Sequence, residues 1–186
     1  MAVSTIDQKP ALVVVDLQKG TAALPSAHPI ETVVANSVRL AEAFRARELP
    51  VVLVNVTGLA PGRTESPRRT TSFPADFAEL LPELNVQPTD VLVTKTVWGA
   101  FTGTSLHDTL RELGVTQVVV TGVATQVGVE STARSAYEHG YHVVLATDAM
   151  TSYDATAHDY SVENIFPRLG ETGTTDEVLE LLAKSA

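Results

Sequence analysis

Two charged residues in this chain stand where acid–base chemistry would need them. Asp16 ends the apolar run VVVD, and Lys95 ends the run VLVTK. If both runs are strands of one parallel sheet, an acid and a base reach the same edge, where α/β proteins bind their ligands. Each residue also has a structural explanation, since Asp16 can cap the following loop and Lys95 can extend towards water.

A third candidate is the turn GVATQVG, residues 122–128, which leads from another apolar run into a predicted helix. The start of a helix offers free N–H groups and partial positive charge, which favour an anion or an oxyanion. Gly128 lets a ligand approach the backbone closely. Ordinary turn chemistry explains these residues equally well. The chain contains no cysteine, which excludes a thiol nucleophile, disulfides and thiolate metal sites.

Short apolar runs alternate with helical patterns along the chain. The predicted strands are 11–16, 50–56, 90–95, 117–122 and 142–150, with a short sixth strand near 168–172. The predicted helices are one from residue 30, then 77–84, 105–114, 129–137, 155–166 and 174–186, the last with Thr174 or Thr175 near its N-cap. The segment 57–74, rich in Pro, Gly, Arg and Thr, is predicted to be a long loop, and loops of that length in compact domains are often lids or binding loops.

The pattern predicts an α/β fold. Strand runs without polar alternation, separated by helices, are typical of a mainly parallel sheet, here of six strands, with helices on both faces. We therefore expect a three-layer α/β/α, Rossmann-like fold, with residues 1–186 forming a single domain. Ligands of such folds bind beyond the carboxyl ends of the strands, which is where Asp16 and Lys95 stand.

Composition narrows the class of partner. Hydrophobic residues make up 44% and charged residues 19% of the chain, a balance that is typical of globular proteins. The net charge of -9 argues against nucleic-acid binding and gives no reason to expect an anionic membrane surface as partner. The N-terminus shows no signal-peptide pattern, and no apolar run approaches the roughly 18 residues that span a bilayer. We expect a cytoplasmic protein that acts on a small molecule.

Three blocks of sequence together resemble the isochorismatase-like hydrolase superfamily: VVVDLQ, TKTVWGAFTGTSLHDTLRELGV and VVVTGVATQVGVESTARSAYEHGYHVVLATDAM. The resemblance covers nearly the whole chain in the right order, and it implies the isochorismatase fold. Most members are amidases that use an Asp, a Lys and a Cys, and these positions fall on Asp16, Lys95 and Gly128. The resemblance also implies a cis peptide bond between Val123 and Ala124.

The resemblance gives Gly128 a specific meaning, because true isochorismatases also carry Gly at this position and hydrolyse a vinyl ether. Such a bond is activated by protonating a carbon, so the implied general acid is Asp16. Burial would raise the pKa of this carboxyl group and Lys95 would lower it, and the sequence leaves the balance open. Ala124 and Gln126 differ from the turn of true isochorismatases, and the flanks resemble the amidases, which indicates a cysteine-less branch.

Further residues are predicted to contact a substrate or to matter for catalysis. The predicted substrate-binding residues are Gln18, Trp98, Phe101, Val123, Ala124, Thr125 and Val127. For Phe101 the alternative is core packing, and for Gln18 it is capping of the loop. One arginine of the long loop, Arg63, Arg68 or Arg69, is a candidate for binding a carboxylate. Thr125 and Ser131 are alternative nucleophiles, although the sequence places no histidine base beside either.

Three functional hypotheses remain open. The first is acid-catalysed hydrolysis of a small, isochorismate-like enol ether with Asp16 as the acid. The second is hydrolysis of a small amide by water that Asp16 activates, and the third is a catalytically inactive ligand-binding or scaffold protein. We expect no cofactor and no metal, because the Asp-x-His metal motif of nicotinamidases is missing from VNVTGLAPG. The resemblance also implies a homodimer or a homotetramer.

Overall fold

Six parallel strands form one sheet at the centre of the computed structural model, which describes residues 3–65 and 72–185. The strands lie in the order β3-β2-β1-β4-β5-β6. All pairings between neighbouring strands are parallel, which confirms the predicted sheet. The strands are β1 (Pro10–Val15), β2 (Val51–Val56), β3 (Val91–Lys95), β4 (Gln117–Val123), β5 (His142–Thr151) and β6 (Glu171–Gly173).

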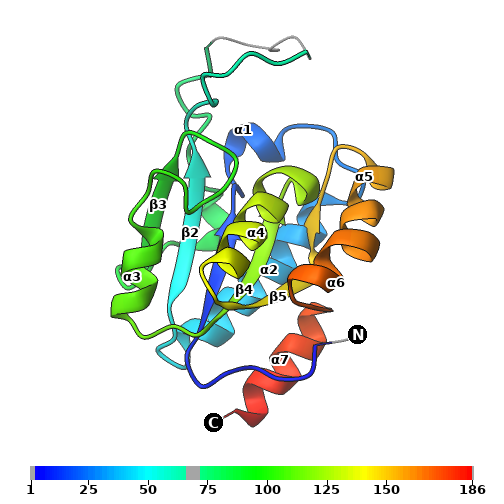
Figure 1. Ribbon diagram of the computed structural model, residues 1–186. Helices are drawn as coiled ribbons and strands as arrows, with labels where there is room; N and C mark the ends of the chain where they lie inside the picture. Colours follow the sequence, from blue (N-terminus) through cyan, green and yellow to red (C-terminus); the bar gives the residue numbers. More distant parts are fainter. Residues whose placement is uncertain (1–2, 66–71, 186) are drawn as a thin grey trace.

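Helices cover both faces of this sheet, as the predicted three-layer fold requires (Figure 1). Successive residues of a strand point to opposite faces, so Val13 of β1 lies in one core cluster and Leu12 in the other. The helices α2 (Ile30–Arg45) and α7 (Thr175–Lys184) pack against the face that carries Leu12. The opposite face packs against α3 (Leu106–Glu112), α4 (Glu130–Glu138) and α6 (Phe166–Leu169).

Shorter helical elements complete the connections. A single turn, α1 (Lys19–Ala22), follows β1. The helix predicted over 155–166 is present as a continuous helical segment made of α5 (Ala155–Tyr160), a π-helical turn η3 (Ser161–Ile165) and α6. A second π-helical turn, η2 (Thr125–Val129), precedes α4. No helix in the described part of the chain is long and apolar enough to cross a bilayer.

The helix predicted over 77–84 is wrong, since only a short 3₁₀ turn, η1 (Pro82–Leu84), forms there. The Gln18 side chain donates to the carbonyl of Phe77 at 2.9 Å, and the Asn55 side chain donates to the carbonyl of Ala78 at 2.8 Å. Because side chains from the ends of β1 and β2 hold these carbonyls, the segment packs as a strap across the strand ends and does not coil.

Two smaller features refine the prediction. The sixth strand lies at 171–173, slightly later than expected, and Thr174 caps α7 through a reciprocal capping box with Glu177. The edge strand β3 alternates between exposed and buried residues, whereas a strand buried on both faces was expected. Leu92 is 61% exposed, because only the face of β3 that carries Val93 and Lys95 packs against the core.

Candidate active site

Asp16 lies directly after β1, at the carboxyl edge of the sheet. Its φ of 53° is in the left-handed region, which Asp and Asn adopt more readily than other side chains. The backbone N–H donates to the carbonyl of Val54 at 2.9 Å, and the backbone carbonyl accepts from the hydroxyl of Thr21. The sheet and α1 therefore fix the backbone of Asp16, from which the carboxyl group extends.

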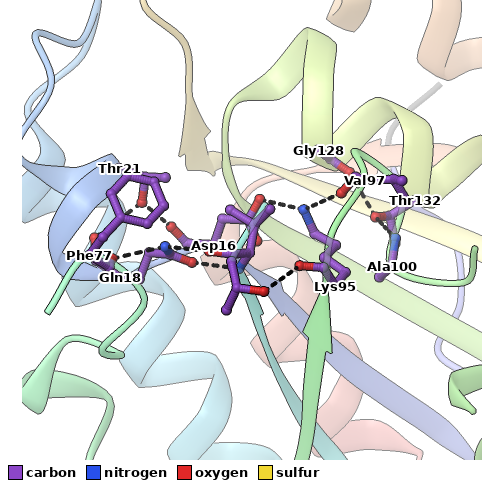
Figure 2. A network of polar contacts seen from close by, with 11 residues as sticks. Asp16, Gln18, Thr21, Phe77, Lys95, Val97, Ala100, Gly128 and Thr132 are labelled. Carbon is purple, nitrogen blue, oxygen red and sulfur yellow. Dashed lines mark hydrogen bonds and ion pairs between the residues drawn. The ribbon is translucent and has the colours of Figure 1, made fainter. Parts of the chain in front are cut away.

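Lys95, the last residue of β3, forms a buried ion pair with Asp16. Its Nζ lies 2.7 Å from Asp16 Oδ2 and donates a second hydrogen bond to the carbonyl of Val97 at 3.1 Å (Figure 2). The side chains of Lys95 and Asp16 are only 1% and 7% exposed. Strand β2 separates β1 from β3, so the long lysine side chain crosses the end of β2 to reach the carboxylate. The strand order thus brings the predicted acid and base together.

The electrostatics of the pair answer the question that the sequence left open. Burial raises the pKa of Asp16 to about 6, while the charge and the hydrogen bond of Lys95 lower it. Burial therefore has the larger effect, and the carboxyl group titrates close to neutral pH. Lys95 contacts Oδ2, whereas Oδ1 is buried without a hydrogen-bond partner among the described residues. The oxygen Oδ1 is therefore the atom of the carboxyl group that can carry a proton.

Gly128 packs its backbone against this carboxyl group. It lies in the π-helical turn η2, directly after the cis peptide bond between Val123 and Ala124 that the resemblance implied. A Cβ atom at Gly128 would lie 3.1 Å from Asp16 Oδ2 and 3.0 Å from Val15 Cγ1. Glycine consequently lets the turn pack this closely against the acid, because a Cβ at this position would press on both atoms.

Thr132 connects the turn to the segment that follows Lys95. Its hydroxyl donates to the carbonyl of Gly128 at 2.7 Å and accepts the N–H of Ala100 at 3.1 Å (Figure 2). The hydroxyl is buried on the first turn of α4. The segment that follows Lys95 and the turn that carries Gly128 are therefore held to each other through one side chain.

The amide of Gln18 is engaged on both sides by the protein. Its Nε2 donates to the carbonyls of Val56 at 3.0 Å and Phe77 at 2.9 Å, and its Oε1 accepts the N–H of Val56 at 2.7 Å. The side chain is fully buried. These bonds join β1, β2 and the strap, which is a structural task, so the predicted substrate contact of Gln18 stays a prediction.

The remaining predicted residues fall in different environments. Trp98 is 59% exposed just beyond Lys95, whereas Phe101 is buried in the core cluster that faces α3 and α4. Val123, Ala124 and Thr125 are buried, and Val127 and Ser131 are half-buried. Arg63 is exposed in the long loop, and Arg68 and Arg69 lie outside the described residues. The contacts of these residues with a substrate stay predictions.

Thr125 has a histidine partner that the sequence did not indicate. Its hydroxyl lies 2.8 Å from Nδ1 of His158 on α5, and both residues are buried. The ring of His28 packs edge-on against His158 at 4.6 Å between centroids. Burial, together with His28, lowers the pKa of His158, so this ring is neutral at pH 7. The sequence contains one indication of this buried position: His158 and Ser161 are three positions apart on a predicted helix. In the structure both lie on the buried face of the helical segment.

The Thr125–His158 contact anchors the turn that carries Gly128. We expect Thr125→Val to reduce the free energy of unfolding by about 1–3 kcal/mol, because it leaves the buried His158 nitrogen without a partner. Urea denaturation at pH 7 measures the change. Thr116→Val is the control, because Thr116 is exposed and water can replace its bond to Asp7. Equal stabilities of both variants would contradict an anchoring role.

The arrangement as a whole is suited to proton transfer. It combines the Asp16 carboxyl group, which titrates near neutral pH, with the buried cation of Lys95. At the point where the turn lies nearest to this carboxyl group, it carries a glycine and therefore no side chain. In the described ranges, no group of three or more His, Asp or Glu residues is placed to hold a metal ion.

Comparison with known proteins gives a consistent result. The family described as "Isochorismatase domain" matches residues 10–177. The uncharacterized isochorismatase family protein YwoC of Bacillus subtilis is 42% identical, over 93% of this chain and 94% of that protein. An isochorismatase family protein from Burkholderia thailandensis superposes with a TM-score of 0.94 at 41% identity, covering 98% and 100% of the two chains. N-carbamoylsarcosine amidase from Thermoplasma acidophilum superposes with a TM-score of 0.74 at 28% identity, covering 90% and 97%.

Proposed function

Because this chain belongs to the isochorismatase family, we propose that it hydrolyses a small enol ether of the isochorismate class, with Asp16 as the general acid. The observation that carries the proposal is the state of the Asp16 carboxyl group. It is buried, its pKa is raised to about 6, and its Oδ1 has no partner among the described residues. A glycine stands beside it where an amidase would need a nucleophile.

The chemistry needs one proton donor and one water. Protonated Asp16 gives its proton to the terminal carbon of the enol ether, which produces an oxocarbenium ion. Water attacks the adjacent carbon, and the proton that this water loses returns to the Asp16 carboxylate. The hydroxyl proton of the resulting hemiketal then passes to the leaving oxygen as the C–O bond breaks, which releases a keto acid and an alcohol. Lys95 stabilises the carboxylate during the interval in which it has lost its proton.

The direct test is release of pyruvate from isochorismate, followed with lactate dehydrogenase and NADH. We expect turnover by the wild-type protein well above the spontaneous decay of isochorismate in the same buffer. A rate that does not differ from this decay at millimolar substrate would overturn the proposal.

A second candidate is amide hydrolysis by water that ionised Asp16 activates. Two observations favour it: the similarity to N-carbamoylsarcosine amidase, and a pKa that leaves Asp16 largely ionised above pH 7. Ammonia release from a panel of small amides tests this candidate. If neither assay shows turnover, the third hypothesis, an inactive ligand-binding protein, is favoured.

The direction of the pH dependence separates the two candidates. A general acid works only while it is protonated, so we expect kcat/KM for the enol ether to fall about tenfold per pH unit above the Asp16 pKa of about 6. A general base works when it is ionised, so amide hydrolysis would rise through the same pH and then level off. Rates measured from pH 4.5 to 8.5 decide, and a flat profile would contradict both roles for Asp16.

A further inference from the structure

The connection between β5 and α5 brings a tyrosine to the edge of the sheet where Asp16 lies. In the sheet register, Val15 pairs with Gly122, and Gly122 pairs with Met150. Asp16 directly follows Val15 at the end of β1. The next residues in β4 and β5 are Val123 and Thr151, which pair with each other. Tyr153 lies two residues beyond Thr151, at the same edge of the sheet as Asp16.

The protein holds this connection in place on both sides of Tyr153. Ser152 is 1% exposed, and its carbonyl accepts the N–H of Ala27 at 2.7 Å. Asp154 caps α5 by accepting the N–H of Thr156 at 2.9 Å. Tyr153 between them is 49% exposed. A large aromatic side chain thus stands on a fixed backbone with part of its surface uncovered, which is typical of residues that contact a ligand.

The charge of Asp16 acts on the phenol of Tyr153. Burial raises the pKa of Tyr153, and the negative charge of Asp16 raises it further. The hydroxyl is therefore protonated throughout the pH range in which Asp16 titrates, and it is a hydrogen-bond donor there. Asp16 Oδ1 has no partner among the described residues, so the two groups are not hydrogen-bonded to each other.

We propose that Tyr153 contacts the substrate, its hydroxyl donating a hydrogen bond to an oxygen of a ligand that lies between it and the Asp16 carboxyl group. The identity of that oxygen rests on the proposed function: for an enol ether of the isochorismate class it is a carboxylate or the ether oxygen. A site that protonates carbon with one group and holds oxygen with another fixes the orientation of its substrate. Tyr153 would thus add to substrate affinity, while Asp16 performs the proton transfer.

Tyr160 provides a matched control in the same region. It lies on α5 and is 60% exposed, slightly more than Tyr153. It lines a cleft of about 510 Å³ together with Gln126, Glu130 and Arg134, and neither Asp16 nor Tyr153 is among the residues that line this cleft. Removing its hydroxyl tests the loss of an exposed phenol near the site without touching the space beside Asp16.

The kinetic test compares Tyr153→Phe with Tyr160→Phe. We expect Tyr153→Phe to lower kcat/KM for isochorismate about 10–100-fold, mainly through a higher KM, because a hydrogen bond to a charged oxygen is lost. We expect Tyr160→Phe to stay within twofold of wild type. Kinetic constants of Tyr153→Phe within twofold of wild type would overturn the proposal.

A second measurement needs no substrate, so it separates this proposal from the proposed function. Tyrosines labelled with ¹³C at Cζ are titrated by NMR in the wild type and in Asp16→Asn, with Tyr153→Phe used to assign the resonance. We expect the pKa of Tyr153 to fall when the Asp16 charge is removed, and the resonance of Tyr160 to titrate unchanged. An unchanged Tyr153 would overturn the inference, whereas a shift without isochorismate turnover would support it and reject only that substrate.

Discussion

Asp16→Asn is expected to lower kcat/KM about 10²–10⁴-fold, the usual contribution of a general acid. Asparagine has almost the same shape, and its amide oxygen still accepts the hydrogen bond from Lys95. The left-handed backbone at this position, with φ of 53°, also suits Asn. The change therefore removes the transferable proton and leaves the fold in place. Pyruvate release measured at pH 6 gives the effect.

Asp154→Asn is the matched control for this variant. Asp154 lies on the same edge of the sheet and caps α5 through its side chain, a task that Asn performs equally well. We expect wild-type activity from Asp154→Asn. If Asp16→Asn kept more than a tenth of wild-type kcat/KM, the proton would have to come from another group, and the role assigned to Asp16 would be wrong.

The elements that the sequence predicted well are those whose cause is local. Uninterrupted runs such as ALVVVD predict buried parallel strands, because a half-exposed strand would need polar residues at alternate positions. The N-cap predicted at Thr174 or Thr175 is also local: it lies at Thr174, whose capping box with Glu177 joins residues three positions apart. The helix predicted over 77–84 failed for the opposite reason. Its carbonyls are held by Gln18 and Asn55, which are distant in sequence.

In the candidate site, too, the features with local causes were predicted, and those that depend on residues distant in sequence were not. The expectation that Asp16 and Lys95 lie at one edge needed only that both residues end strands of one parallel sheet, whereas their 2.7 Å contact across the end of β2 is seen only in the structure. The partners of the turn could not be predicted in this way, because His158 is 33 residues from Thr125 and a helical pattern does not say what its buried face meets. Tyr153 was missed because a residue in a connection has no periodicity that indicates its direction. The balance between burial and ion pairing at Asp16 also needed the packed structure.

The buried pair has different consequences for activity and for stability. Lys95 stabilises the buried Asp16 anion, and it lowers the pKa of Asp16, which burial alone would raise further. Replacing such a pair by well-packed apolar residues is often neutral for stability or increases it. Retention of both charges beside an unoccupied carboxyl oxygen is therefore more consistent with proton transfer than with structural support alone.

Lys95→Met is accordingly expected to impair both activity and stability. Without the lysine, the two influences that lower the pKa of Asp16 disappear, so this pKa rises above about 6. Asp16 is then a weaker acid, and its anion has no counter-charge during the reaction. We expect kcat/KM to fall about 10²-fold or more, with the descending limb of the pH profile shifted to higher pH. The rate profile from pH 4.5 to 8.5 measures both changes.

The stability of Lys95→Met should depend on pH in a defined direction. Between about pH 4 and the raised pKa, the folded protein holds a proton on Asp16 that the unfolded chain has already lost. The free energy of unfolding therefore falls as the pH rises through this range. We expect little loss at pH 5, where Asp16 is neutral, and about 3–5 kcal/mol at pH 8, where a buried anion stands unpaired. Urea denaturation at both pH values measures it. Lys19→Met, which breaks the exposed pair with Glu79, is the control and should change little at either pH. An equal loss at pH 5 and pH 8 would show that Lys95 acts through packing and that its charge does not matter.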